Sequence, residues 1–121
     1  MTRIALTQQN LLGTAGLTLP ATGTQTLATY TGVSFTNNGL MFLAVYVGSA
    51  GAGNLTENFG PTTEGSVTAP VVHALANSTN YLFGPWSPTD FTATDGTGLT
   101  YLDFSVVTGN SVTLYQLVPA L

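Results

Sequence analysis

The chain has 121 residues, of which 44% are hydrophobic and only six are charged, with one arginine, no lysine and no cysteine. One cation cannot neutralise a phosphate backbone or an anionic membrane, so the composition excludes nucleic-acid binding by charge and a polybasic membrane anchor. The absence of cysteine excludes disulfides and thiolate chemistry, and so poor a supply of charge favours a protein that packs against copies of itself or a larger partner.

The first 25 residues are predicted to form an N-terminal arm or irregular segment, followed by a β-sandwich domain over residues 26–121. Ile4 and Leu6 alternate with more polar neighbours, as in a short strand or an ordered arm. Residues 13–23 are rich in Gly, Thr and Pro and are expected to form a loop. Because residues 1–12 lack the apolar core of a signal peptide, we expect cytoplasmic synthesis without export.

Short strands are then predicted at 26–30 and 33–36. Asn37-Asn38-Gly39 is a turn signal, because Asn and Gly accept positive φ at low cost, and it predicts a hairpin into a strand over 40–47. This strand is apolar at both its odd and its even positions. A half-exposed strand would alternate, so both faces must be covered, by a second layer or by a neighbouring subunit.

The rest of the chain continues as strands and turns. Residues 54–65 are expected to be irregular, and the two prolines of 84–91 exclude regular structure there. Pro70 places its strand at a sheet edge or a bulge. Further strands are predicted at 66–75, 79–83, 99–107 and 111–118. The pattern predicts an all-β, single-domain β-sandwich or jelly-roll-like fold of seven to eight short strands.

Residues for catalysis are scarce. His73 is the single histidine and lies in an apolar strand, where a packed or rim histidine is expected. Asp90, Asp95 and Asp103 could approach one another as a carboxylate pair, or Asp90 and Asp95 could help to bind calcium, but turn formation for Asp90 and Asp95 and outward orientation for Asp103 are the favoured explanations. One histidine without cysteine cannot build a zinc site. We therefore predict no enzyme activity, no cofactor and no metal.

Two interpretations remain open for the aromatic residues near the second half of the chain. Trp86, Phe91 and Tyr101 could form a platform on which a sugar stacks. Alternatively, Pro85 and Trp86 plug one end of the sandwich or insert into a neighbouring subunit. Arg3 either pairs with an acid on a partner or is solvated at the terminus.

From Val33 onward the order of features resembles the small capsid decoration (cement) proteins of tailed bacteriophages. The resemblance covers about two-thirds of the chain and rests on a turn with an apolar strand, a Pro-rich segment, a tight turn and two later strands. In chain order these are residues 37–46, 84–91, 95–96, 99–104 and 112–117.

The resemblance implies a non-enzymatic structural protein that binds the outside of an assembled capsid and stabilises contacts between capsomers. It further implies the major capsid protein as partner, a homotrimer, and a place on the virion surface after synthesis in the host cytoplasm, with no role for nucleic acid or membrane. The alternatives are a carbohydrate-binding β-sandwich module and a tail-tube or connector protein. The predicted interface residues are Arg3, Leu40, Phe42, Tyr46, Pro85, Trp86 and Phe91.

Overall fold

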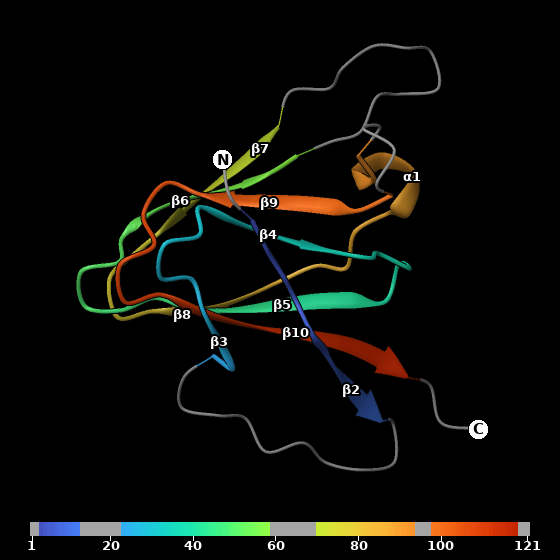
Figure 1. Cartoon of the computed structure of the whole chain (residues 1–121), viewed down its shortest axis with the longest axis horizontal. Coiled ribbons are helices and arrows are strands. Elements are labelled where there is room, and N and C mark those ends of the chain that lie inside the picture. The colour runs from blue at the N-terminus through green and yellow to red at the C-terminus, as the bar shows by residue number, and fades with distance from the viewer. Residues whose placement is uncertain (1–2, 13–22, 59–69, 94–97, 119–121) are drawn as a thin grey trace.

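The computed structural model describes residues 3–12, 23–58, 70–93 and 98–118. These residues form ten strands and one short helix, arranged as two packed β-sheets (Figure 1). In chain order they are β1 (Arg3–Ala5), β2 (Gln8–Leu12), β3 (Gln25–Thr26), β4 (Gly32–Phe35), β5 (Met41–Tyr46), β6 (Gly53–Glu57), β7 (Val71–Leu75), β8 (Asn80–Phe83), α1 (Pro88–Phe91), β9 (Thr100–Phe104) and β10 (Ser111–Val118). No helix within these ranges is long and apolar enough to cross a membrane.

The two sheets have the connectivity of a jelly roll. Sheet 1 has the strand order β1-β4-β9-β6-β7, and sheet 2 has the order β2-β10-β5-β8, with β3 also paired to β10. Strands β3 to β10 pair antiparallel in two groups of four, β3-β10-β5-β8 and β4-β9-β6-β7, so that most successive strands lie in opposite sheets. The predicted all-β sandwich or jelly-roll-like fold is confirmed. β1 and β2 raise the number of strands above the seven to eight expected.

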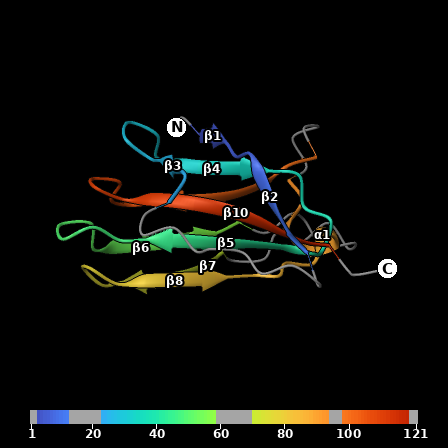
Figure 2. The ribbon, with the colours of Figure 1, turned by 90° about the horizontal axis from the view of Figure 1, so that it is seen from below.

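The N-terminal strands add one strand to each sheet. β1 pairs parallel with β4 in sheet 1, and β2 pairs parallel with β10 in sheet 2. Residues 3–12, part of the segment 1–25 predicted as an arm or irregular segment, therefore pass from one sheet to the other along one side of the sandwich (Figure 2). Ile4 and Leu6 pack against the core, and the burial of their apolar surface stabilises the attachment of this segment to the sandwich.

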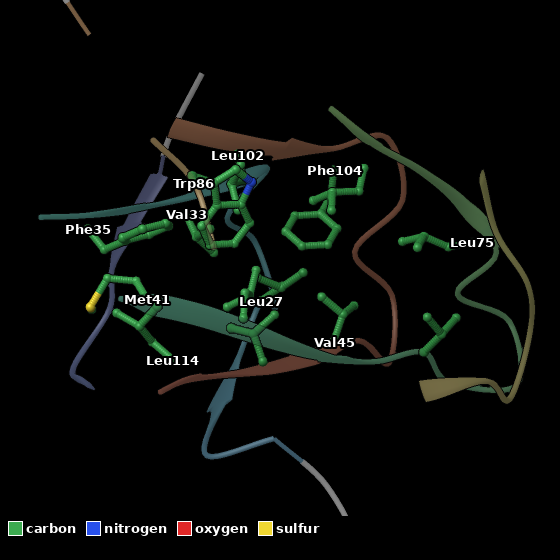
Figure 3. Packing of buried hydrophobic residues seen from close by; sticks show 14 residues of the cluster. Leu27, Val33, Phe35, Met41, Val45, Leu75, Trp86, Leu102, Phe104 and Leu114 are labelled. Atoms are coloured by element: carbon green, nitrogen blue, oxygen red, sulfur yellow. The ribbon is translucent and has the colours of Figure 1, made fainter. Parts of the chain in front are cut away.

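The core lies between the sheets and is built from alternate residues of the facing strands (Figure 3). β5 contributes Met41, Leu43 and Val45, and β9 contributes Leu102 and Phe104, as the alternation in 99–107 predicted. Leu43 and Leu102 are 0% exposed. Burial of each such leucine stabilises the fold by about 2–3 kcal/mol.

The turn at Asn37-Asn38-Gly39 forms, but the predicted hairpin is wrong. Gly39 has a φ of 87°, Asn37 Oδ1 accepts a hydrogen bond from the Gly39 N–H at 3.0 Å, and Asn38 Oδ1 accepts one from the Leu40 N–H at 2.9 Å. The turn joins β4 in sheet 1 to β5 in sheet 2, so these strands do not pair with each other. Each instead pairs with strands distant in sequence, and the inner apolar faces of both strands then reach one interlayer core.

Two further expectations require correction. Residues 54–65 were expected to be irregular, but Gly53–Glu57 form β6, which lies between β7 and β9 and buries Leu55 at 0% exposure. Residues 84–91 were expected to lack regular structure, but Pro88–Phe91 form the one-turn helix α1. Proline is tolerated in the first turn of a helix, where its missing N–H has no partner to lose. β7 begins directly after Pro70 and is an edge strand, as predicted.

Candidate functional site

Five apolar side chains lie on the outer face of sheet 2, turned away from the core. Leu82 of β8 is 65% exposed, Leu40 and Leu117 are each 38% exposed, and Phe42 and Tyr46 are half-buried. We call these five residues the outer patch. Three of them, Leu40, Phe42 and Tyr46, were predicted as interface residues from the sequence. Their common face follows from the two-residue period of β5, whose other side chains fill the core.

The members of the outer patch are neighbours across the sheet. The Leu117 N–H donates a hydrogen bond to the Leu40 carbonyl oxygen at 2.9 Å, which holds these two residues side by side. Leu82 lies opposite Ala44 of β5 and is thus a diagonal neighbour of Phe42 and Tyr46. Because all five are carried by strands or their immediate ends, the outer patch is a rigid surface and not a loop tip.

Tyr115 lies beside the outer patch on the same face but is nearly inaccessible, with 2% exposure. It is paired with Phe42, and its hydroxyl group makes no hydrogen bond of good geometry within the described residues. Burial raises the pKa of Tyr115 above the ordinary value of 10.0, and the neighbouring phenol of Tyr46 raises it further. The residue packs as a neutral side chain beside Phe42, on the same face as the outer patch.

The described charged side chains lie away from the outer patch. Arg3 and Asp103 lie on the outer face of sheet 1, Glu57 points between the sheets, and Asp90 is in α1. The outer patch therefore combines exposed apolar area with an absence of charge. Such a surface is typical of a contact with another protein, since an apolar patch has a free-energy cost when water covers it.

Arg3 is paired within its own chain. Its Nε donates to Asp103 Oδ1 at 2.8 Å and its Nη2 donates to Asp103 Oδ2 at 2.9 Å, while its guanidinium carbon lies 4.1 Å from the centre of the Tyr101 ring. Asn58 Nδ2 donates a further hydrogen bond to Asp103 Oδ2 at 2.8 Å. The suggested pairing of Arg3 with an acid on a partner is thus corrected, because β1 brings the guanidinium directly over β9.

The acidic residues weighed as a catalytic pair are not brought together. Asp103 is neutralised by Arg3 on sheet 1, Asp90 is exposed in α1, and Asp95 lies outside the described residues. No three His, Cys, Asp or Glu side chains gather in a way that would hold a metal ion within the described ranges.

One acid–base pair forms that the sequence pattern does not predict. His73 Nε2 lies 2.9 Å from Glu57 Oε1, with Glu57 8% exposed and the His73 ring 4.9 Å from the ring of Phe83. Glu57 comes from β6, the strand that sequence analysis missed, and so its partnership with His73 was not foreseen. Among the described residues no hydroxyl group hydrogen-bonds to either side chain, so a nucleophile does not complete a triad.

Trp86 belongs to the core. It is 3% exposed, packs against Phe35 with ring centres 5.4 Å apart, and its carbonyl oxygen accepts a hydrogen bond from Asn37 Nδ2 at 3.1 Å. The view that Trp86 plugs one end of the sandwich is the one the structure shows (Figure 3). As a predicted interface residue it is corrected, because a buried indole offers no surface to a partner or to a sugar. Pro85 is exposed nearby, and Phe91 packs partly against the core.

A shallow hollow of about 380 Å³ lies at the end of the sandwich where β3 and the turn before β10 meet. It is lined by small residues, of which only some have polar side chains: Gly23, Thr26, Ala28, Gly109, Asn110 and Ser111. The Asn110 amide is fully used for structure, since Nδ2 donates to Gly51 O at 3.1 Å and Val106 O at 2.9 Å while Oδ1 accepts from the Gly48 N–H at 3.0 Å. The hollow therefore lacks the convergent free polar groups of a ligand site.

Leu82 and Leu117 complete the outer patch and were missed from the sequence. Each is an apolar residue at an outward position of its strand. The sequence alone does not show this, because the inward positions must first be known from the strand pairing. Comparison with known proteins adds no relative: no family model, no curated protein and no solved structure matches this chain.

Proposed function

We propose that this chain is a non-enzymatic structural protein of a virion. In this proposal it binds the outside of a tailed-phage capsid, with the major capsid protein as its partner, and stabilises contacts between capsomers. The observation that carries the proposal is the outer patch, an uncharged apolar surface on a rigid sheet. The resemblance of residues 37–46 and 84–91 to capsid decoration proteins supports the same role and implies a homotrimer on the shell.

Binding to a capsid needs a broad, pre-ordered contact surface more than it needs reactive groups. The exposed leucines Leu40, Leu82 and Leu117 would each gain about 1–2 kcal/mol on burial against a partner, and the strands that carry them lose little conformational freedom on binding. Because the outer patch has no charge, this binding would depend weakly on ionic strength. A carbohydrate-binding role gains no support, since Trp86 is buried.

The proposal is tested by co-sedimentation of the purified chain with DNA-free capsids from a panel of tailed phages. Leu40→Asp and Leu117→Asp each place a carboxylate in the outer patch at a position that is already 38% exposed, so both variants should fold. We expect the wild-type chain to sediment with a shell to a fixed ratio and both variants to lose at least tenfold in affinity.

Ser49→Asp is the matched control, because Ser49 is exposed in the loop between β5 and β6 and the change in charge is the same. It should bind like the wild type. Equal binding by the outer-patch variants and the wild type, or binding to no shell in the panel, would count against the proposal.

A further inference from the structure

Two edge strands lie along the same side of the sandwich. β7 is the last strand of sheet 1 and β8 is the last strand of sheet 2, and Figure 2 shows both along the side opposite β1 and β4. The rings of His73 and Phe83, one from each edge, lie 4.9 Å apart, so the two edges face each other across the interlayer space. The sandwich thus ends on this side in two parallel rows of backbone.

Both rows present backbone groups that no described residue satisfies. The Val47 N–H donates a hydrogen bond to the Thr79 carbonyl oxygen at 3.1 Å, so Thr79 is a residue whose backbone groups face β5. Backbone direction alternates along an antiparallel strand, so Asn80 and Leu82 point their N–H and C=O groups away from β5. On β6, the Asn54 carbonyl oxygen accepts a hydrogen bond from the N–H of Ser105, directly after β9, at 2.9 Å and so points away from β7.

The residue of β7 opposite Asn54 is Ala74, and by the same alternation Val72 and Ala74 direct their backbone groups outward. The described part of the chain provides no hydrogen-bond partner on the outer side of either edge.

Apart from their short length and Pro70 directly before β7, these edges lack the devices that protect exposed strands. Natural proteins place proline, or lysine and other charged residues, on open edges to prevent pairing with another chain. Residues 71–83 contain neither proline nor any charged side chain apart from the single histidine. Val72 is 55% exposed and Leu82 is 65% exposed. An unprotected apolar edge in a folded protein indicates that a partner strand covers it in the assembled state.

The spacing of the two edges selects the partner. A single extended peptide could cover one edge, but only a partner with two edges at the thickness of a sandwich, about 10 Å, covers both. A second copy of this chain, turned about a two-fold axis perpendicular to the sheets, presents β7 to β7 and β8 to β8 at that spacing. Because residues 71–83 carry no formal charge with His73 neutral, the copies meet without like-charge repulsion.

We infer that two copies of this chain pair edge to edge, antiparallel, so that each sheet continues from one copy into the other. Tyr81 and Phe83, which are partly buried inner residues of β8, then meet their counterparts and join the two cores. The inference does not rest on the proposed function, because edge pairing uses the backbone of β7 and β8 and leaves the outer patch apart from Leu82 open for a different partner. A dimer in solution would stand against the homotrimer that the resemblance to decoration proteins implies, without bearing on shell binding itself.

The test is the mass of the purified full-length chain by light scattering, from dilute solution to the solubility limit. Val72→Lys places a charge on the β7 edge at a side chain that is 55% exposed and points away from the outer patch. We expect a dimer for the wild type and half that mass for Val72→Lys at the same concentration. Ala50→Lys, in the exposed loop between β5 and β6, is the matched control and should remain dimeric.

A wild-type chain that is a monomer at all concentrations, a trimer or an open-ended polymer would overturn the inference, and so would an unchanged mass for Val72→Lys. A second measurement, cysteine cross-linking with a short bis-maleimide, locates the two-fold axis. Because the chain has no cysteine, each variant carries a single thiol. The yield of cross-linked dimer is compared between Asn80→Cys, Tyr81→Cys or Leu82→Cys and the control Ala50→Cys. Two-fold pairing predicts strong cross-linking in β8 and none at Ala50. Shell binding by Val72→Lys reports separately on the proposed function.

Discussion

Asn110 is the residue whose side chain connects the most backbone at one end of the sandwich. It is 2% exposed and bonds to Gly48, Gly51 and Val106, and its own carbonyl oxygen accepts from the Leu27 N–H at 3.1 Å. Asn110→Ala would remove three hydrogen bonds and leave their partners unpaired. We expect the free energy of unfolding to fall by about 3 kcal/mol, measured by urea denaturation.

Asn10→Ala is the control for this change, since Asn10 is exposed in β2. It should alter the free energy of unfolding by less than about 0.5 kcal/mol. Similar losses for both variants would show that the Asn110 amide does not hold the loops together.

Tyr115 predicts a specific dependence of stability on pH. Its pKa is raised in the folded protein, chiefly by burial, so when pH rises past the ordinary value of 10.0 the unfolded chain loses the phenol proton first. The contribution of neutral Tyr115 to stability is therefore fully present below about pH 10 and is lost as pH rises toward the folded pKa.

Tyr115→Phe should be within about 0.5 kcal/mol of the wild type at neutral pH, because the hydroxyl makes no hydrogen bond of good geometry with a described residue. Above pH 10 the variant should retain stability that the wild type loses, as measured by urea denaturation at a series of pH values. If the free energy of unfolding fell equally with pH above 10 in both proteins, Tyr115 would not be the source of the pH dependence.

At the scale of elements, β1 depends on one charged pair. Its backbone pairs with sheet 1 only at β4, and the Arg3 side chain extends over β4 to reach Asp103 on β9. Arg3→Ala should lower the free energy of unfolding by about 1 kcal/mol, a modest value because the two side chains are 26% and 15% exposed. The local signature is faster hydrogen exchange at the Leu6 amide, which bonds to the Ser34 carbonyl at 3.0 Å.

Arg3→Lys keeps the charge without the two-pronged geometry and should exchange at an intermediate rate. Exchange at Leu6 that is unaffected by either variant would mean that the apolar contacts of Ile4 and Leu6 alone hold β1 in place.

The strands that the sequence predicts well are those with a clear apolar rhythm. β9 alternates cleanly, and its inward residues are the ones buried in the structure. β6 was not predicted because its sequence, Gly-Asn-Leu-Thr-Glu, contains only one large apolar residue. It forms a strand because it pairs with β9 on one side and β7 on the other. The turn at Gly39 was located correctly but its role was not, because positive φ fixes a local bend and does not decide which sheet receives the next strand.

For the whole molecule, composition predicts that charged residues are few, but it does not predict which surface lacks them. The described charges are concentrated on sheet 1, in the interior and in α1, and this distribution leaves the outer patch neutral. Leu40, Phe42 and Tyr46 were predicted because β5 is apolar on both faces. Leu82 and Leu117 needed the pairing of β8 and β10 with β5, which is set by contacts between residues far apart in sequence.

The position of β10 also dictates when the protein can fold during its synthesis. β10 pairs with β2, β3 and β5, and it is the last of the described strands to leave the ribosome. The Gln8 and Gln116 side chains, 108 positions apart in the sequence, are hydrogen-bonded in the finished sheet. Until β10 emerges, β2 and β3 have no strand to pair with, and β5 lacks a neighbour on one side. Completion of sheet 2 therefore has to wait for β10, and we expect a nascent chain that stops before residue 111 to expose the apolar inner face of β5.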